Sequence, residues 1–182
     1  MKDIRTYILE SFKLGKNKVI KPTEYKYFPN NKNELKEILE ERLKEYPNAD
    51  LNDIDTSNVK DMSLLFFNFN PHNIDISDWD VSNVEDMNGM FLNCQKFNCN
   101  LSEWDVSNVK DMNRMFSNCP RFNCDLSKWD VSNVEDMNHM FYRCEKFEGK
   151  GLEKWNVSKV WDMELMFYGC YSMKNKPSWY EE

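Results

Sequence analysis

Apolar and polar positions recur along most of the chain with a period of 25 residues. Four segments share the pattern [LI]-x-x-W-x-V-x-x-V-x-x-M-x-x-M-F-x-x-C: 76–94, 101–119, 126–144 and 152–170. A shorter copy covers 54–69, and we number the five copies as the first to the fifth repeat. A unit of this length cannot bury its own apolar face. The period therefore predicts that successive repeats stack and share one core.

Within each repeat the apolar spacing changes from two to three or four. The part around Trp104 and Val106 alternates apolar and polar residues, which predicts a short strand. The part from Val109 onward carries apolar residues three and four positions apart, which predicts a short helix. Asn108 and Asp111 have the spacing of a capping box for that helix, and most other repeats keep the same pair.

The ends of the chain differ from the repeats. The segment 33–46 has apolar residues at helical spacing, and we expect Asn33 to cap this helix and Pro47 to end it. Trp179 falls near the place of the next repeated tryptophan, which predicts an incomplete unit that closes the stack. The expected organisation is an N-terminal helical cap region over 1–50, the repeats over 51–172 and a C-terminal cap over 173–182.

The repeated motif W-D-V-S-N-V-x-D-M-x-x-M-F resembles the BspA-like leucine-rich repeats of Mycoplasma-type and other bacterial surface proteins, over roughly residues 51–172. The resemblance implies a right-handed solenoid with a parallel sheet on its concave side. It also implies adhesion or protein–protein binding without a catalytic centre. The expected fold class is thus α/β: a leucine-rich-repeat-like solenoid of short parallel strands and short helices, with the N-terminal helical segment as its cap.

Charge and composition limit the kinds of partner and the cellular locations that we expect for this protein. The net charge is −7, and residues 49–182 hold 13 Lys and Arg against 23 Asp and Glu. Such an acidic body does not attract nucleic acid, whose binding depends on neutralised phosphates. The longest apolar run is far shorter than the ~20 residues that span a bilayer. The N-terminus lacks the pattern of a secretory signal. We therefore expect a cytoplasmic protein, with a surface location only if a targeting segment exists outside this sequence.

Cysteine and methionine occupy repeated positions. Four cysteines end successive repeats, and two more recur five residues later; they are Cys94, Cys119, Cys144 and Cys170, then Cys99 and Cys124. Packing in the core is the favoured interpretation because Phe69 and Ile74 fill these positions in the first repeat. Disulfides and a zinc site remain alternatives, although structural zinc sites usually take closely spaced cysteine pairs. The methionine pairs are also interpreted as core, and no metal or cofactor is expected.

In the first three full-length repeats an aspartate directly follows the tryptophan, at Asp80, Asp105 and Asp130. Stacked carboxylates repel one another unless they are satisfied, and we expect Ser82, Ser107 and Ser132 or nearby backbone amides to do so. Binding of a cation or of a basic partner segment is the alternative. The two histidines lie in no recognisable nucleophile motif, and the sequence has no glycine-rich phosphate loop, so no catalytic residue is predicted.

Recognition is expected at positions where the repeats differ. The aromatic group near the C-terminal end is the strongest candidate because aromatic residues often anchor interfaces. The candidate partner-binding residues are Asp80, Asp105, Asp130, Arg114, His139, Tyr142, Trp161, Tyr168 and Tyr171. The sequence thus favours a non-enzymatic scaffold that binds a protein. A small effector, for example phage-encoded, that inhibits a host enzyme or a nucleic-acid machine is the alternative. A structural or self-assembling protein is the other alternative.

Overall fold

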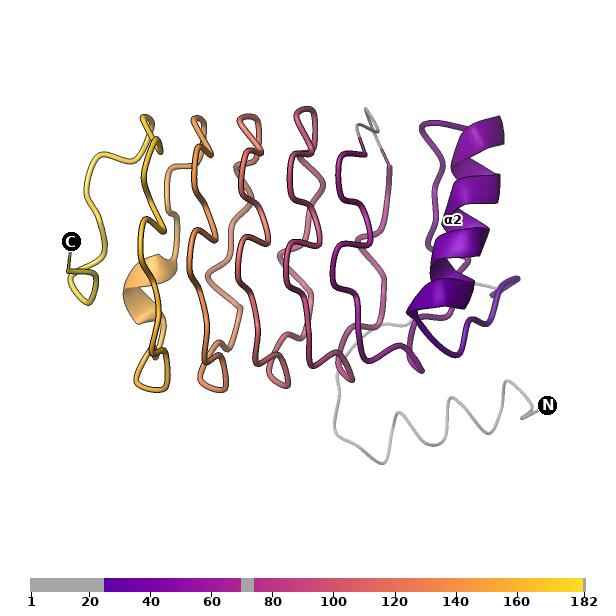
Figure 1. Cartoon of the computed structure of the whole chain (residues 1–182), viewed down its shortest axis with the longest axis horizontal. Helices are drawn as coiled ribbons and strands as arrows, with labels where there is room; N and C mark the ends of the chain where they lie inside the picture. Colours follow the sequence, from indigo (N-terminus) through magenta and orange to yellow (C-terminus); the bar gives the residue numbers. More distant parts are fainter. Residues whose placement is uncertain (1–24, 70–73, 182) are drawn as a thin grey trace.

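The computed structural model describes residues 25–69 and 74–181. In Figure 1 the repeats lie side by side as successive layers, with helix α2 over the end nearer the N-terminus and residues 171–181 at the other end. Helix α2 spans Lys32–Glu45, and a single 3₁₀ turn, η1, spans Leu152–Lys154. These are the only helices within the described ranges.

The predicted α/β leucine-rich-repeat-like solenoid is wrong. In the described part of the chain the β-pairing between neighbouring repeats is limited to isolated parallel bridges, such as Asp86 with Asp111 and Asp111 with Asp136. No repeat contains an extended strand, and the expected helix after Val109 is replaced by turns. The repeats are therefore layers of irregular, turn-rich chain, without a sheet.

Two left-handed backbone positions in each repeat explain why the expected helices are absent. In the third repeat these positions are Arg114, with φ 53°, and Asn118, with φ 58°. An α-helix needs φ near −63° at every residue, so two positive angles within five residues prevent it. The other full repeats and the first repeat keep the same two positions: Leu64 and Asn68, Gly89 and Asn93, His139 and Arg143, and Leu165 and Gly169.

Hydrogen bonds between repeats replace both the helix and the sheet. Alternate N–H groups of one repeat donate to carbonyls of the next, with Arg114 donating to Asn138 at 2.9 Å and Phe116 to Met140 at 2.9 Å. The N–H groups between them close local turns, as Met115 does by donating to the carbonyl of Met112 at 3.1 Å. The backbone is thus satisfied layer by layer.

The predicted capping boxes are also wrong. The Nδ2 group of Asn108 donates to the carbonyl of Ser82 in the preceding repeat at 2.7 Å, and so joins two layers. Asp111 instead accepts a bond from the N–H of Asn113 at 2.8 Å, within its own turn. Both side chains still bind backbone groups, but neither starts a helix.

The core consists of equivalent side chains that stack from repeat to repeat. The Trp, Phe and Cys residues of the repeat pattern are buried in all four full-length repeats, as are nearly all its Val and Met residues, as the stacking prediction requires. Phe91 and Phe116 stack at 5.5 Å between ring centroids, and Phe116 and Phe141 at 5.7 Å. A second phenylalanine column, which the sequence analysis did not identify, packs against the first at 4.0 to 4.2 Å: Phe97, Phe122 and Phe147.

Helix α2 covers the first layers with one apolar face, on which Leu35, Leu39 and Leu43 are buried. Its N-cap is Asn31 and not Asn33, because the side chain of Asn31 accepts the N–H groups of Asn33 and Glu34. The predicted helix is therefore confirmed, with its N-cap two residues earlier than expected. The sequence also predicts a second, shorter amphipathic stripe, which lies outside the described residues: Ile4, Ile8, Leu9 and Phe12.

Trp179 closes the tryptophan column at the other end. Its ring lies 6.4 Å from that of Trp155, and its indole N–H donates to the carbonyl of Leu152 at 2.8 Å. The same bond recurs in the inner repeats, where Trp104 donates to Ile76 at 3.1 Å. The C-terminal segment thus supplies the tryptophan of one further layer.

Candidate interaction surface

Large apolar side chains are exposed on the fifth repeat and directly after it. Trp161 is 71% exposed, Leu165 40%, Tyr168 55% and Tyr171 81%. The inner repeats carry charged residues, glutamine or proline in place of Trp161 and Tyr171, so these two rings are specific to one end of the stack. We call these four residues together with Tyr142 the aromatic cluster.

Part of this cluster is ordered by ring stacking across two layers. Tyr142 and Tyr168 stack at 5.3 Å with an angle of 15° between their planes. His139 lies 5.1 Å from Tyr142 on one side, and the guanidinium of Arg143 lies 5.2 Å from the same ring. The structure therefore brings together three of the predicted site residues, and it adds Arg143, which the sequence analysis did not select.

Arg114 occupies the same repeat position as His139 and Leu165 but lies one layer further from the cluster. Its side chain is exposed and lies 3.4 Å from the side-chain oxygen of its neighbour Asn113. Trp161 belongs to another column, whose inner members alternate in charge: Lys60, Glu85, Lys110 and Glu135. It therefore places an aromatic ring at the end of a row of charges.

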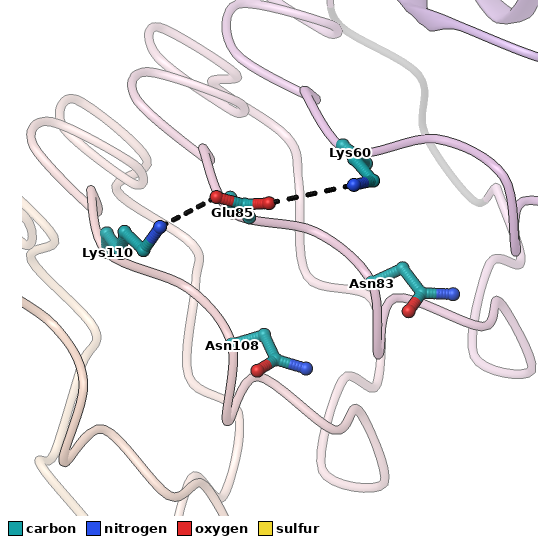
Figure 2. Close-up of a pocket in the computed structure, with 5 residues that line it drawn as sticks. All are labelled: Lys60, Asn83, Glu85, Asn108 and Lys110. Carbon is teal, nitrogen blue, oxygen red and sulfur yellow. Dashed lines mark hydrogen bonds and ion pairs between the residues drawn. The ribbon is translucent and has the colours of Figure 1, made fainter.

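The charged column borders a shallow polar hollow of about 280 Å³ (Figure 2), lined by Lys60, Asn83, Glu85, Asn108 and Lys110. Glu85 lies 2.7 Å from the ammonium of Lys110 and 3.9 Å from that of Lys60. The hydrogen bond and charge of Lys110 lower the pKa of Glu85. Because the amide groups of both asparagines already donate to backbone carbonyls, the hollow offers few unengaged groups to a ligand.

The aspartate column has the structural role that the sequence predicted. A carboxylate oxygen of Asp80 accepts both the N–H of Ser82 at 3.0 Å and its hydroxyl at 2.6 Å. Asp105 and Asp130 bind their serines through the same N–H bond. The hydrogen bonds from Ser132, through its hydroxyl and then its N–H, lower the pKa of Asp130. Whether these three carboxylates also bind a partner stays a prediction.

The repeated cysteines are part of the core. The thiol of Cys119 donates to the carbonyl of Phe91 at 2.9 Å, and that of Cys144 to Phe116 at 3.0 Å. Burial raises the pKa of both thiols well above the ordinary value. All six cysteines are free, and five of them are buried. The described residues include no group of three His, Cys, Asp or Glu side chains that could hold a metal ion.

The period, the parallel bridges and the buried columns define the chain as a repeat protein. The family described as "Mycoplasma protein of unknown function, DUF285" matches residues 33–150 and 64–180. The chain therefore belongs to this Mycoplasma-type repeat family, which confirms the broader part of the resemblance. The comparisons with curated proteins and with solved structures found no match. Across residues 25–69 and 74–181 no helix combines the length and the apolarity that crossing a membrane requires.

Proposed function

We propose that this chain is a non-enzymatic scaffold that binds a protein partner through the aromatic cluster. The observation that carries the proposal is the exposure of Trp161, Tyr168 and Tyr171, three large aromatic rings, on the last repeat and directly after it. Tryptophan and tyrosine are enriched among the residues that contribute most to protein–protein affinity. A rigid presentation of such rings lowers the entropy that is lost on binding.

The surroundings of the cluster support a protein partner. Tyr142 is held between Tyr168, His139 and Arg143, so its ring is already fixed before a partner arrives. The core rings of the same two layers also stack, Phe141 on Phe167 at 5.8 Å and Trp129 on Trp155 at 6.4 Å. The exposed rings thus belong to layers with a packed core.

The test compares two triple variants as baits in affinity enrichment from cells that express the protein. The first variant is Trp161→Ala with Tyr168→Ala and Tyr171→Ala. The matched control is Phe28→Ala with Tyr46→Ala and Phe67→Ala, which removes three rings that are 60, 59 and 44% exposed at the other end. We expect one set of proteins to be retained by the unmodified chain and by the control, and to be lost by the first variant.

Two results would contradict this proposal. Equal retention of the partner by both triple variants would show that the aromatic cluster does not bind it. Loss of the partner from both variants, with unchanged melting temperatures, would place the binding surface elsewhere. Because all six residues are exposed, neither variant should change the free energy of unfolding by more than about 0.5 kcal/mol per residue.

A further inference from the structure

Each inner repeat presents the same row of backbone groups to the layer that follows. In the third repeat the N–H groups of four alternate residues donate to carbonyls of the fourth repeat at 2.7 to 3.0 Å: Met112, Arg114, Phe116 and Asn118. Just before this row, the carbonyl of Lys110 accepts the N–H of Glu135 at 2.8 Å. One acceptor followed by four donors is therefore the pattern that a following layer must match.

In the fifth repeat most of this row has no partner. The equivalent groups are the carbonyl of Trp161 and the N–H groups of Met163, Leu165, Phe167 and Gly169. No backbone or side-chain group of residues 25–69 and 74–181 binds the Trp161 carbonyl or the N–H groups of Met163, Leu165 and Gly169. The N–H of Phe167 differs, because it faces the hydroxyl of Tyr180. Burial raises the pKa of that hydroxyl, although hydrogen bonds from the backbone of Met166 and Phe167 act in the opposite direction.

The apolar cover of this row is also incomplete. Met163 and Val160 are only partly buried, whereas their equivalents Met137 and Val134 in the fourth repeat are fully buried. The C-terminal segment covers only part of this edge: Trp179 lies on Trp155, and the ring of Tyr180 lies 4.9 Å from that of Phe167. An edge with unpaired N–H groups and uncovered apolar side chains is a template for another chain.

Resting on the proposed function, we propose that the partner supplies an extended segment that pairs in parallel with this edge. The segment presents carbonyl oxygens to the N–H groups of Met163, Leu165 and Gly169 and one N–H to the carbonyl of Trp161, and it displaces the side chain of Tyr180 from Phe167. Its apolar side chains have the M-x-x-M-F spacing of these repeats, because that spacing covers the equivalent edge of every inner layer. The exposed rings of Trp161 and Tyr168 then flank the bound segment.

A second copy of this protein does not fit the edge in the same way. The complementary carbonyl row of the first repeat lies at the end of the stack over which α2 packs (Figure 1). Lys32 of that helix also donates to the hydroxyl of Ser63 at 2.7 Å and pairs with Asp61 at 2.7 Å. The proposed occupant is therefore a segment of another polypeptide that carries the repeat's spacing without such a cap.

The test uses a synthetic peptide with the sequence of residues 133–146, NVEDMNHMFYRCEK, and a scrambled peptide of the same composition. Residues 133–146 contain the four carbonyls that bind the edge of the third repeat inside the molecule. The peptides are titrated into the full, ¹⁵N-labelled chain. We expect saturable shift changes and slower hydrogen exchange at the amides of Met163, Leu165 and Gly169 with the matching peptide alone.

A pair of variants distinguishes the loss of binding at this edge from a general effect of an added negative charge. Leu165 and Leu64 occupy the same repeat position with φ near 55°, and both are partly exposed. Aspartate tolerates this left-handed conformation, so both variants should fold. We expect Leu165→Asp to weaken peptide binding at least about tenfold, because the carboxylate replaces apolar cover and repels carbonyls. Leu64→Asp should leave binding unchanged.

Equal responses to both peptides, or no response, would overturn the edge-pairing proposal. So would shift changes at these amides that depend on protein concentration without peptide, since a second copy would then occupy the edge. Suppose that the triple variant of the aromatic cluster no longer retains the cellular partner, and that this partner does not slow hydrogen exchange at these amides of the unmodified chain. Edge pairing would then be refuted, and the proposed function would stand. Peptide binding at the edge, with full retention of the cellular partner by the aromatic variant, would refute the proposed function alone.

Discussion

At the scale of single residues, the tryptophan column combines burial with a directed hydrogen bond. Trp104 is 2% exposed, its ring lies 6.3 Å from that of Phe91, and its indole N–H donates to the carbonyl of Ile76. The polar atom of a large core residue is thus satisfied by the neighbouring layer. Sequence alone predicted the burial, from a spacing of 25 residues, but it did not predict the bond to the preceding layer.

Trp104→Ala should lower the free energy of unfolding by about 3–5 kcal/mol, because it leaves a cavity and an unpaired carbonyl between two layers. A urea melt followed by fluorescence measures the loss. Trp161→Ala is the matched control, since a 71% exposed ring should change stability by less than about 0.5 kcal/mol. A loss under about 1 kcal/mol for Trp104→Ala would contradict its place in the core.

The buried thiols should make stability depend on alkaline pH. Burial, and then the neighbouring Cys170, raise the pKa of Cys144 well above the ordinary value. A thiol of the unfolded chain ionises near pH 8.5. Since the folded pKa is the higher one, the stabilisation by the neutral thiol is complete below about pH 8.5 and declines as the pH rises further, by up to about 1.4 kcal/mol per pH unit.

Cys144→Ala tests this dependence. The variant should be less stable at neutral pH because it loses buried volume and a bond to Phe116. Its stability should fall less steeply than that of the unmodified chain between about pH 9 and 10.5, since one fewer thiol must be ionised in the unfolded state. Parallel slopes in urea melts across this range would refute the raised pKa of this thiol.

At the scale of elements, the sequence predicted α2 well and the repeats poorly. The spacing of Leu35, Leu39 and Leu43 is a property of one helix, and propensity and capping decide it locally. Inside the repeats, bonds to the next layer favour a positive φ at residues such as Arg114 and His139. Local periodicity carries no signal for such bonds, so the expected strand and helix of each repeat were wrong.

The capping of α2 gives a prediction that separates the two asparagines. Asn31→Ala should cost about 0.5–2 kcal/mol, because the side chain of Asn31 accepts two N–H groups of the first turn. Asn33→Ala should have little effect, since this residue lies inside the helix and alanine favours that position. Thermal melts of the two variants compare them directly, and a larger loss for Asn33→Ala would restore the sequence-based assignment.

The candidate surface was predicted in part. Trp161 and Tyr171 stood out in sequence because they replace charged residues, glutamine or proline of the inner repeats. The stack of Tyr142 on Tyr168 follows from their equivalent positions in neighbouring layers. The unpaired N–H groups of Met163 and Leu165 could not be predicted, because backbone groups leave no trace in a pattern of side chains.

At the scale of the whole molecule, layers that contact mainly their neighbours should be removable one at a time. Deletion of residues 101–125 removes one full period and leaves Leu126 to take the place of Leu101. We expect a folded protein with one cooperative urea transition, a lower midpoint and a smaller m-value, because one layer interface and its buried surface are lost.

The matched control deletes residues 101–112, which is about half a period and shifts the columns on one side of the deletion out of register with those on the other. We expect this chain to lose its cooperative transition, because Trp, Met and Phe positions of neighbouring layers no longer coincide. Similar melts for both deletions would show that the register between layers does not determine stability.

The short reach of the contacts between layers bears on how the protein is made. Side-chain bonds between neighbouring repeats join residues only 23 to 29 positions apart. A ribosome extends a chain by roughly 5–20 residues per second, so one further period emerges within a few seconds, whereas loops close in microseconds or less. Each layer can therefore settle on the finished one before it while translation continues, and the growing protein exposes only one unfinished edge at a time.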